Sequence, residues 1–426
     1  MTTTFRGSIC TLAAALTMTV ALHGQTLNTI FNFEHGKTGY HPIGSLSIDA
    51  NGNLYGTTQR GGVPDLGVAY ELVPPASPGG AWTELVLHSF TGVKGDGSPS
   101  AGLLIEPTGS LYGVTYGPTN DGSVFRLNPP AAPDPHWRET ILHVFTGANG
   151  DGEGPESAPV LGPHRVLYGS TRGGGASGDG AVFSLAPPNA QGSPWTEHVL
   201  HSFTGSNGDG DAPGPVILGP NAIIYGVTGY GGGLGFGSVF QLTPPLTPGG
   251  SWTETVLCQF GYQNGESGYP NGVVLGPGGV LYGTAFGGNG KACDSGCGSV
   301  FQLAPPAEQG GAWTETVLHS FAGAGTADGN QPNSTPVIGP GGVLYGTTIS
   351  GGAIGYGTVY EMLPPSSPGG TWTEVVLHSF SGGADGVYPN AVTLGPDGNL
   401  YGTTEEGGAP KDGIHNQGTV FQLVLQ

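Results

Sequence analysis

The sequence predicts an all-β protein: a seven-bladed β-propeller of four-stranded antiparallel blades, closed by pairing of the N- and C-terminal strands. The phrase Leu-Tyr-Gly, once Ile-Tyr-Gly, recurs seven times at steps of 56 to 63 residues. A period of this size indicates one supersecondary unit copied along the chain. A second phrase, of the type Trp-Thr-Glu, occurs only six times, so one copy is a strand short. The repeated tyrosines are Tyr55, Tyr112, Tyr168, Tyr225, Tyr282, Tyr345 and Tyr401.

Each copy reads as short strands separated by Gly- and Pro-rich turns. In the last copy, apolar residues 391–394 and 400–404 flank a Gly-Pro-Asp-Gly-Asn turn, and a third strand follows at 419–423. Earlier copies add a fourth strand, such as residues 82–90, and no segment has the helical period of 3.6 residues. A four-stranded unit of this length is typical of a propeller blade.

The two ends of the chain predict how the ring closes. The seventh copy stops after its third strand, and residues 29–33 near the N-terminus align with the fourth strand at 86–90. We therefore expect residues 26–34 to form the outermost strand of the last blade. Splitting one repeat between the termini suits a ring, because it removes the free sheet edges. Residues 25–426 are then one propeller domain.

Residues 1–24 are interpreted as a signal peptide. Arg6 precedes an apolar stretch at about residues 9–22, which is too short for a comfortable membrane span. No later segment is apolar enough to cross a bilayer. We expect the mature protein to be secreted or periplasmic and monomeric.

The charge balance excludes some partners. The chain holds 30 Asp and Glu against 10 Lys and Arg, for a net charge of −20. Nucleic acid and anionic lipid both need clustered cations, so neither is expected as a ligand.

Three phrases carry a family resemblance. The strings at 397–404 (Asp-Gly-Asn-Leu-Tyr-Gly-Thr-Thr), 418–421 (Gly-Thr-Val-Phe) and 376–380 (Val-Leu-His-Ser-Phe) resemble the GloVer repeat of bacterial choice-of-anchor tandem-repeat proteins. The resemblance covers nearly all of the mature chain and implies an exported, propeller-like bacterial protein. It implies no known activity. The chain lacks a recognisable C-terminal sorting anchor, which favours free secretion or the periplasm over surface attachment.

The cysteines predict one local disulfide. Cys293 and Cys297 lie four apart in a Gly-rich loop, and a disulfide is the leading interpretation for an exported protein. Two cysteines are too few for a usual four-ligand zinc site. Cys258 is left as a buried thiol.

Residues present in every copy are interpreted as scaffold. The glutamates after each tryptophan and the histidines of the fourth strands belong to different blades, so we do not expect the histidines to gather as metal ligands. Asp-Gly pairs between blades suit Asx-type turns. Calcium is the alternative, because Asn207, Asp209 and Asp211 alternate as oxygen ligands; no other cofactor is expected. The repeated residues are Glu84, Glu139, Glu197, Glu254, Glu315, Glu374, His88, His143, His201, His319 and His378.

Residues that break the repeat are the better functional candidates. The loops between second and third strands are longest in the fifth and seventh copies. We expect a ligand on the face that holds these loops, where stacking aromatics suit a neutral sugar or an extended peptide; the alternative is that they pack on adjacent loops. The candidate binding residues are Glu405, Glu406, Asp412, His415, Tyr116, Tyr230, Phe286 and Tyr356.

Two functions follow from these candidates. The first is a non-enzymatic binding or cell-surface interaction module for carbohydrate or peptide. The second is a carbohydrate-active enzyme, a polysaccharide lyase or glycoside hydrolase, with its site on the loop face. A hydrolase needs two converging carboxylates, and no catalytic residue is assigned. No nucleophile elbow, zinc-protease helix, phosphate loop or dinucleotide fingerprint occurs in the sequence.

Overall fold

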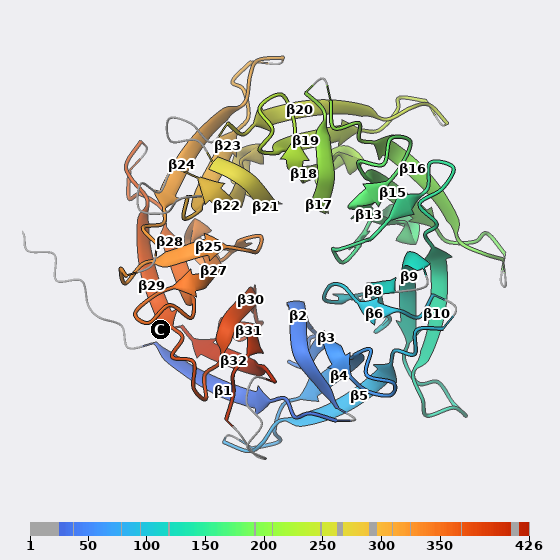
Figure 1. Cartoon of the computed structure of the whole chain (residues 1–426), viewed down its shortest axis with the longest axis vertical. Helices are drawn as coiled ribbons and strands as arrows, with labels where there is room; N and C mark the ends of the chain where they lie inside the picture. The colour runs from blue at the N-terminus through green and yellow to red at the C-terminus, as the bar shows by residue number, and fades with distance from the viewer. Residues whose placement is uncertain are drawn as a thin grey trace, which may run out of the picture.

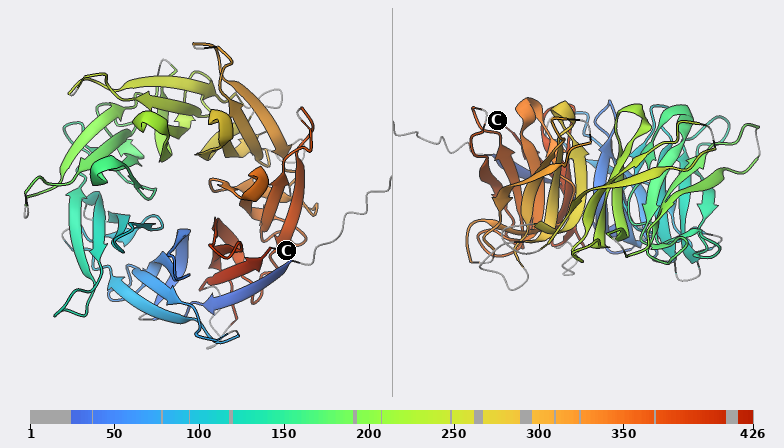
Figure 2. Two further views of the ribbon diagram at one scale, coloured as in Figure 1. Left: turned by 180° about the vertical axis from the view of Figure 1, so that it is seen from behind. Right: turned by 90° about the horizontal axis from the view of Figure 1, so that it is seen from above.

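The computed structural model is a ring of seven antiparallel blades around a central axis (Figure 1), and β11 (Gly152–Glu153) and β14 (Gly173–Gly174) of the third blade pair in a small sheet of their own. It describes residues 25–36, 38–77, 79–93, 95–117, 120–190, 193–206, 208–247, 249–261, 267–288, 296–308, 310–323, 325–367, 369–409 and 417–425. The first strand of each blade faces the centre and the last lies at the rim. Seen from the side, the ring is a flat disc (Figure 2). No helix of the described residues is long and apolar enough to cross a membrane.

The blades follow one another along the chain. Blade 1 holds β2 (Gly39–Ile48), β3 (Leu54–Gly61), β4 (Val68–Val73) and β5 (Thr83–Ser89). Blade 2 holds β6 (Ser98–Pro99), β7 (Leu104–Ile105), β8 (Leu111–Gly117), β9 (Asn120–Asn128) and β10 (Arg138–Val144). Blade 3 holds β11 (Gly152–Glu153), β12 (Val160–Leu161), β13 (Leu167–Thr171), β14 (Gly173–Gly174), β15 (Ala181–Ala186) and β16 (Thr196–Ser202).

The remaining blades keep the same order. Blade 4 holds β17 (Gly210–Leu218), β18 (Ile224–Gly231), β19 (Ser238–Thr243) and β20 (Thr253–Gln259). Blade 5 holds β21 (Ser267–Leu275), β22 (Leu281–Gly288), β23 (Ser299–Ala304) and β24 (Thr314–Ser320). Blade 6 holds β25 (Gly329–Pro332), β26 (Val337–Ile338), β27 (Leu344–Gly351), β28 (Thr358–Leu363) and β29 (Thr373–Ser379). Blade 7 holds β30 (Val387–Leu394), β31 (Leu400–Glu406) and β32 (Thr419–Val424), with β1 (Thr26–Asn32) as its outer strand.

The ring closes as predicted. Strand β1 pairs antiparallel with β32, with Leu27 opposite Leu423 and Phe31 opposite Val420. Figure 1 shows the two ends of the chain side by side in one blade. The strand ends at Asn32, slightly short of the predicted residues 26–34. Among the described residues, the third strand of each blade is therefore paired with an outer strand.

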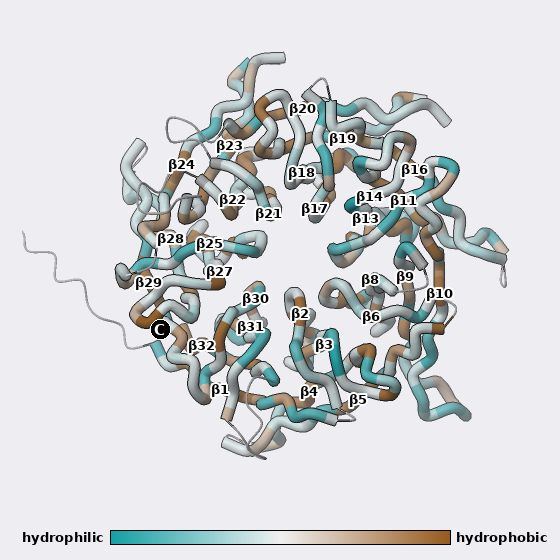
Figure 3. Tube along the Cα trace, in the orientation of Figure 1, coloured by the Kyte–Doolittle hydropathy of each residue, from teal (hydrophilic) through white to brown (hydrophobic). Residues whose placement is uncertain are grey.

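Apolar side chains fill the seams between blades. At every seam, a phenylalanine that follows the outer strand of one blade meets an aromatic ring on the third strand of the next, edge to face at 5.1 to 5.4 Å. The seam that closes the ring obeys the same rule, with Phe33 against Tyr70 at 5.2 Å. Such pairs stabilise beyond the area they bury. Figure 3 shows apolar residues in brown along rim strands such as β10.

One predicted boundary is wrong. Strand β31 runs to Glu406, where residues 400–404 were expected. Glu405 and Glu406 therefore lie at the end of a strand and not in the following loop. The strand extends because β31 continues to pair with β30 as far as Val387 opposite Glu406.

Candidate functional site

Polar side chains that were treated separately in the sequence meet across the seams. His88 at the end of β5 places Nε2 3.1 Å from Asp96 Oδ1 in the loop between blades and 3.7 Å from Glu139 Oε1 on the next rim strand. The same arrangement recurs twice among the described residues, with ligand atoms within 4.8 Å of one another. The two further clusters are His201, Asp209 and Glu254, and His319, Asp328 and Glu374. The prediction that the histidines stay apart from one another holds, but it overlooked their neighbours across the seam.

The hydrogen bonds of these clusters indicate polar contacts that hold neighbouring blades together and not a metal centre. Asp96 accepts hydrogen bonds from the Thr91 backbone N–H at 2.9 Å and from Thr91 Oγ1 at 2.6 Å, besides its contact with His88. Burial raises the pKa of Asp96, but the hydrogen bonds from His88 and Thr91 outweigh it and hold that pKa below the ordinary value. The aspartate is thus occupied by donors, as expected for an Asx-type turn.

The glutamates of the seams have raised pKa values because they are buried. Burial raises the pKa of Glu139 to about 7; His88 opposes this rise and Asp96 adds to it. Burial also raises the pKa of Glu84, Glu197 and Glu374 to about 7 in each case. Each of these buried carboxyls has an acidic neighbour, which is Glu34 for Glu84 and an aspartate for the other three. A buried carboxyl beside another acid is stable as the neutral acid, so these seams are most stable below neutral pH.

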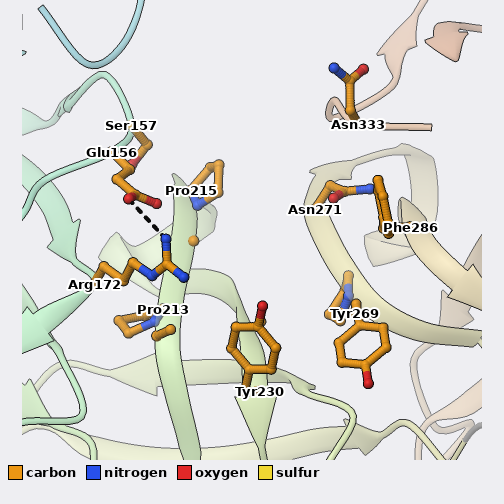
Figure 4. Close-up of a pocket in the computed structure, with 14 residues that line it drawn as sticks. Glu156, Ser157, Arg172, Pro213, Pro215, Tyr230, Tyr269, Asn271, Phe286 and Asn333 are labelled. Atoms are coloured by element: carbon orange, nitrogen blue, oxygen red, sulfur yellow. Dashed lines mark hydrogen bonds and ion pairs between the residues drawn. The ribbon is translucent and has the colours of Figure 1, made fainter. Parts of the chain in front are cut away.

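A cavity of about 670 Å³ lies on the inner side of blades 3 to 6 (Figure 4). The first half of β17 and the end of β18 border it. It therefore lies toward the face of the ring that carries the loops between blades. Its described lining residues are Glu156, Ser157, Arg172, Ala212, Pro213, Gly214, Pro215, Gly229, Tyr230, Tyr269, Pro270, Asn271, Phe286 and Asn333. Volume and lining are typical of a small-molecule site.

Aromatic rings form one wall of the cavity. Tyr230 and Tyr269 approach with ring centroids 5.6 Å apart, and Phe236 supports Tyr269 from behind at 5.5 Å. Tyr269 has a left-handed φ of 56°, and its N–H donates to the Phe236 carbonyl at 2.8 Å. The backbone of the preceding blade therefore fixes where this ring points. Phe286 joins the same wall from β22.

Polar groups form the opposite wall. Arg172 Nη1 lies 3.2 Å from Glu156 Oε1, with the two side chains 54% and 60% exposed, so both remain open to a ligand. The hydrogen bond with Glu156 raises the pKa of Arg172. On the other side of the cavity, beside Phe286, Asn271 donates its amide to the Pro332 carbonyl at 2.7 Å, which fixes the side chain and leaves its oxygen on the cavity side for a hydroxyl donor.

Two missing side chains on blade 4 explain why the cavity lies there. The fourth residue after the repeated tyrosine is near the end of the second strand, at the inner side of the ring, and blade 4 has glycine at that place. The residue after the proline of the first strand is also glycine in blade 4. In blades 1 to 7 the first set is Gln59, Tyr116, Arg172, Gly229, Phe286, Ile349 and Glu405, and the second is Ile43, Ser100, Glu156, Gly214, Asn271, Asn333 and Asn390.

The predicted residues are placed as follows. Tyr230 and Phe286 line this cavity, and Tyr116 lines a second one described below. Tyr356 is 39% exposed on blade 6 and lines neither. Glu405 and Glu406 lie on blade 7, away from the lining residues. Asp412 and His415 lie outside the described residues, as do Asn207 of the calcium hypothesis and Cys293.

The described cysteines fit the disulfide prediction without completing it. Cys297 is buried and disulfide-bonded. Its pairing with Cys293 stays a prediction, because Cys293 is outside the described residues. Cys258 keeps its thiol, but the prediction that it is buried is wrong: it is only half-buried, because it lies on a rim strand, where it donates to Glu315 Oε2 over 3.9 Å.

Sequence reasoning missed Arg172, Glu156, Tyr269 and Gly229. The prediction rested on additional aromatic and charged residues, whereas the cavity arises where glycine replaces a larger residue. A comparison of the seven copies position by position would have found Gly229, because the other six copies have a side chain there.

Comparisons with known proteins agree with the fold. A family model described as the Gloeobacter/Verrucomicrobia repeat matches residues 4–157, 133–324 and 287–426. No curated protein matches the chain. Among solved structures, the extracellular domain of a protein described as a one component system from B. thetaiotaomicron is similar with a TM-score of 0.52 and 11% identity, over 93% of this chain and 40% of that one.

Two further solved structures are similar at lower scores. Penicillium chrysogenum alpha-L-arabinanase, complexed with arabinobiose, has a TM-score of 0.45 and 14% identity over 93% of this chain and 97% of that one. The PQQ-bound aldose sugar dehydrogenase of Streptomyces coelicolor has a TM-score of 0.45 and 16% identity over 76% and 93%. At such identities these likenesses concern the fold.

Proposed function

The chain belongs to the Gloeobacter/Verrucomicrobia repeat family, and we propose that it is an exported binding protein that holds a neutral carbohydrate in the cavity of blade 4 without transforming it. The observation that carries the proposal is the pairing of an aromatic wall, Tyr230 and Tyr269, with a polar wall, Arg172 and Glu156, across one cavity. The flat apolar face of a sugar ring packs on aromatic rings, while its hydroxyls need donors and acceptors at the edge.

The charge of the protein favours a neutral ligand. Arg172 is already compensated by Glu156, and Asp211, on β17, adds to the negative field around it. The whole chain has a net charge of −20. An anionic polysaccharide would be repelled at long range, whereas a neutral sugar pays no such cost.

The carboxylates of the cavity favour binding over hydrolysis. Glu156 is the one acidic side chain among the described residues that line it. Glycoside hydrolysis by the common mechanisms uses two carboxyl groups, one with a raised pKa. The seam glutamates do have a raised pKa, but they lie between rim strands and not in the cavity. A hydrolase would therefore need a second carboxyl group in the cavity, whereas a binding site does not.

A glycan array followed by titration calorimetry tests the proposal. Mature protein should bind neutral oligosaccharides, and Tyr230→Ala should weaken binding about tenfold or more, since aromatic anchors dominate such sites. Tyr356→Ala is the matched control, because this tyrosine is similarly exposed and lines no described cavity. Release of reducing ends from the bound glycan, or binding that survives Tyr230→Ala unchanged, would contradict the proposal.

A further inference from the structure

A second cavity adjoins the first. It has a volume of about 520 Å³ and lies along the inner side of blades 1 to 3. Glu156 lines both cavities, from its position at the beginning of blade 3. The described lining of the second cavity is Gln59, Arg60, Leu66, Ser98, Pro99, Ser100, Tyr116 and Glu156.

The second cavity repeats the chemistry of the first. Tyr116 is 55% exposed, which leaves a ring face available for stacking. Arg60 and Gln59 supply polar side chains to this cavity, as Arg172 and Asn271 do to the first. Both cavities are lined by the same repeat positions, because Gln59 and Tyr116 correspond to Arg172, Gly229 and Phe286 in the copies that follow.

The scaffold beneath the second cavity is fixed. Ser100 Oγ donates to the Pro155 carbonyl at 2.6 Å, and Ser98 Oγ donates to the Gln59 carbonyl at 3.2 Å. These bonds tie the first strands of blades 2 and 3, and the adjoining strand of blade 1, to one another. The two serine side chains therefore fix blade 2 to the backbone of blades 1 and 3, next to the shared Glu156.

We propose that the two cavities form one track for a linear neutral oligosaccharide, with Tyr230 and Tyr269 holding one part of the chain and Tyr116 holding another. Glu156 stands between them, where it can accept a hydrogen bond from a hydroxyl of the intervening sugar. This inference rests on the proposed function and adds the class of ligand: a polymer chain in place of a single sugar. A track of two stacking subsites gains affinity with chain length, because the second subsite is filled at little further entropic cost.

Calorimetry with neutral glucan, xylan and mannan oligosaccharides, from monosaccharides to octasaccharides, tests the track. Affinity should rise at least about tenfold between short and long chains, the effect of roughly 1.4 kcal/mol. Tyr116→Ala should remove this gain with chain length, whereas Tyr230→Ala should weaken the binding of short and long chains alike. Tyr388→Ala is the control, since Tyr388 is 41% exposed and lines neither cavity.

The outcomes separate the two proposals. Short sugars that bind in a Tyr230-dependent way, with no gain from longer chains or with a gain that survives Tyr116→Ala, overturn the track and leave the proposed function standing. Absence of binding to every oligosaccharide of the series overturns both. Circular dichroism of each variant checks that the exposed substitutions leave the fold intact.

Discussion

The glycine of each Leu-Tyr-Gly phrase is required by the ring that lies over it. A Cβ on Gly226 would stand 2.5 Å from Cζ of Phe240 and 3.1 Å from a methyl of Val216. The same crowding by a third-strand aromatic recurs at Gly113, Gly169 and Gly402. The repeated phrase is therefore a packing motif, in which the absence of a side chain on the second strand makes room for the ring on the third.

Gly226→Ala should destabilise the fold by about 1–3 kcal/mol, because the new methyl overpacks a core that has no room to relax. Denaturant unfolding measures the loss. Gly383→Ala is the control: its backbone is not left-handed, and the nearest atom to a Cβ is Ser381 Oγ at 3.6 Å. Phe240→Leu in the Gly226→Ala background should restore part of the stability. Equal stability of Gly226→Ala and Gly383→Ala would contradict this account of the motif.

At the scale of the element, β1 decides whether the ring is closed. It pairs with β32 along the outer edge of blade 7, and Phe33, the residue directly after it, packs against Tyr70 of blade 1. Deletion of residues 25–32 should expose the edge of β32 and cause aggregation or a large loss of thermal stability. A synthetic peptide of residues 25–34 added in trans should reverse part of the loss, and a scrambled peptide should not. A deletion variant that melts like the full mature chain would refute closure by β1.

The sequence predicted elements well and the cavity poorly, for a physical reason. Strands, turns and closure depend on residues that every copy repeats, so each copy tests the interpretation of the others. The cavity depends on Gly214 and Gly229, which break the repeat by lacking a side chain, and on Arg172 and Tyr269, which come from neighbouring blades. The packing of one blade on the next decides which lining residues become neighbours, and the period of the repeat does not predict that packing.

At the scale of the whole molecule, the seams make stability depend on pH. The pKa of Glu84, Glu139, Glu197 and Glu374 is raised by burial to about 7, above the ordinary 4.5. A carboxyl with a raised folded-state pKa contributes stability that is full below about pH 4.5 and is lost as the pH rises to 7. The pKa of the seam aspartates is lowered, so their contribution is lost only under strongly acidic conditions, as the pH falls through their folded-state pKa.

Thermal unfolding should therefore give a higher Tm near pH 5 than at pH 8. Replacing the four glutamates by glutamine should flatten this slope, because glutamine cannot ionise. Glu308→Gln is the control for the loss of one carboxylate outside the seams, since Glu308 is exposed. A Tm that rises from pH 5 to pH 8, or a quadruple variant with the slope of the wild type, would show that the seams do not titrate in this way.

The most direct test of carbohydrate binding in the blade 4 cavity is to fill the gap. Gly229→Tyr places a bulky ring inside the cavity that Gly229 lines, so that it occupies the space proposed for the sugar; the nearest atom to a Cβ there is the Ala212 carbonyl at an ordinary contact distance of 3.5 Å. Titration calorimetry with a neutral oligosaccharide found on the array should show wild-type binding for Ile349→Tyr, the same position on blade 6, and loss of binding for Gly229→Tyr with an unchanged Tm. Wild-type affinity in the Gly229→Tyr protein would contradict the account.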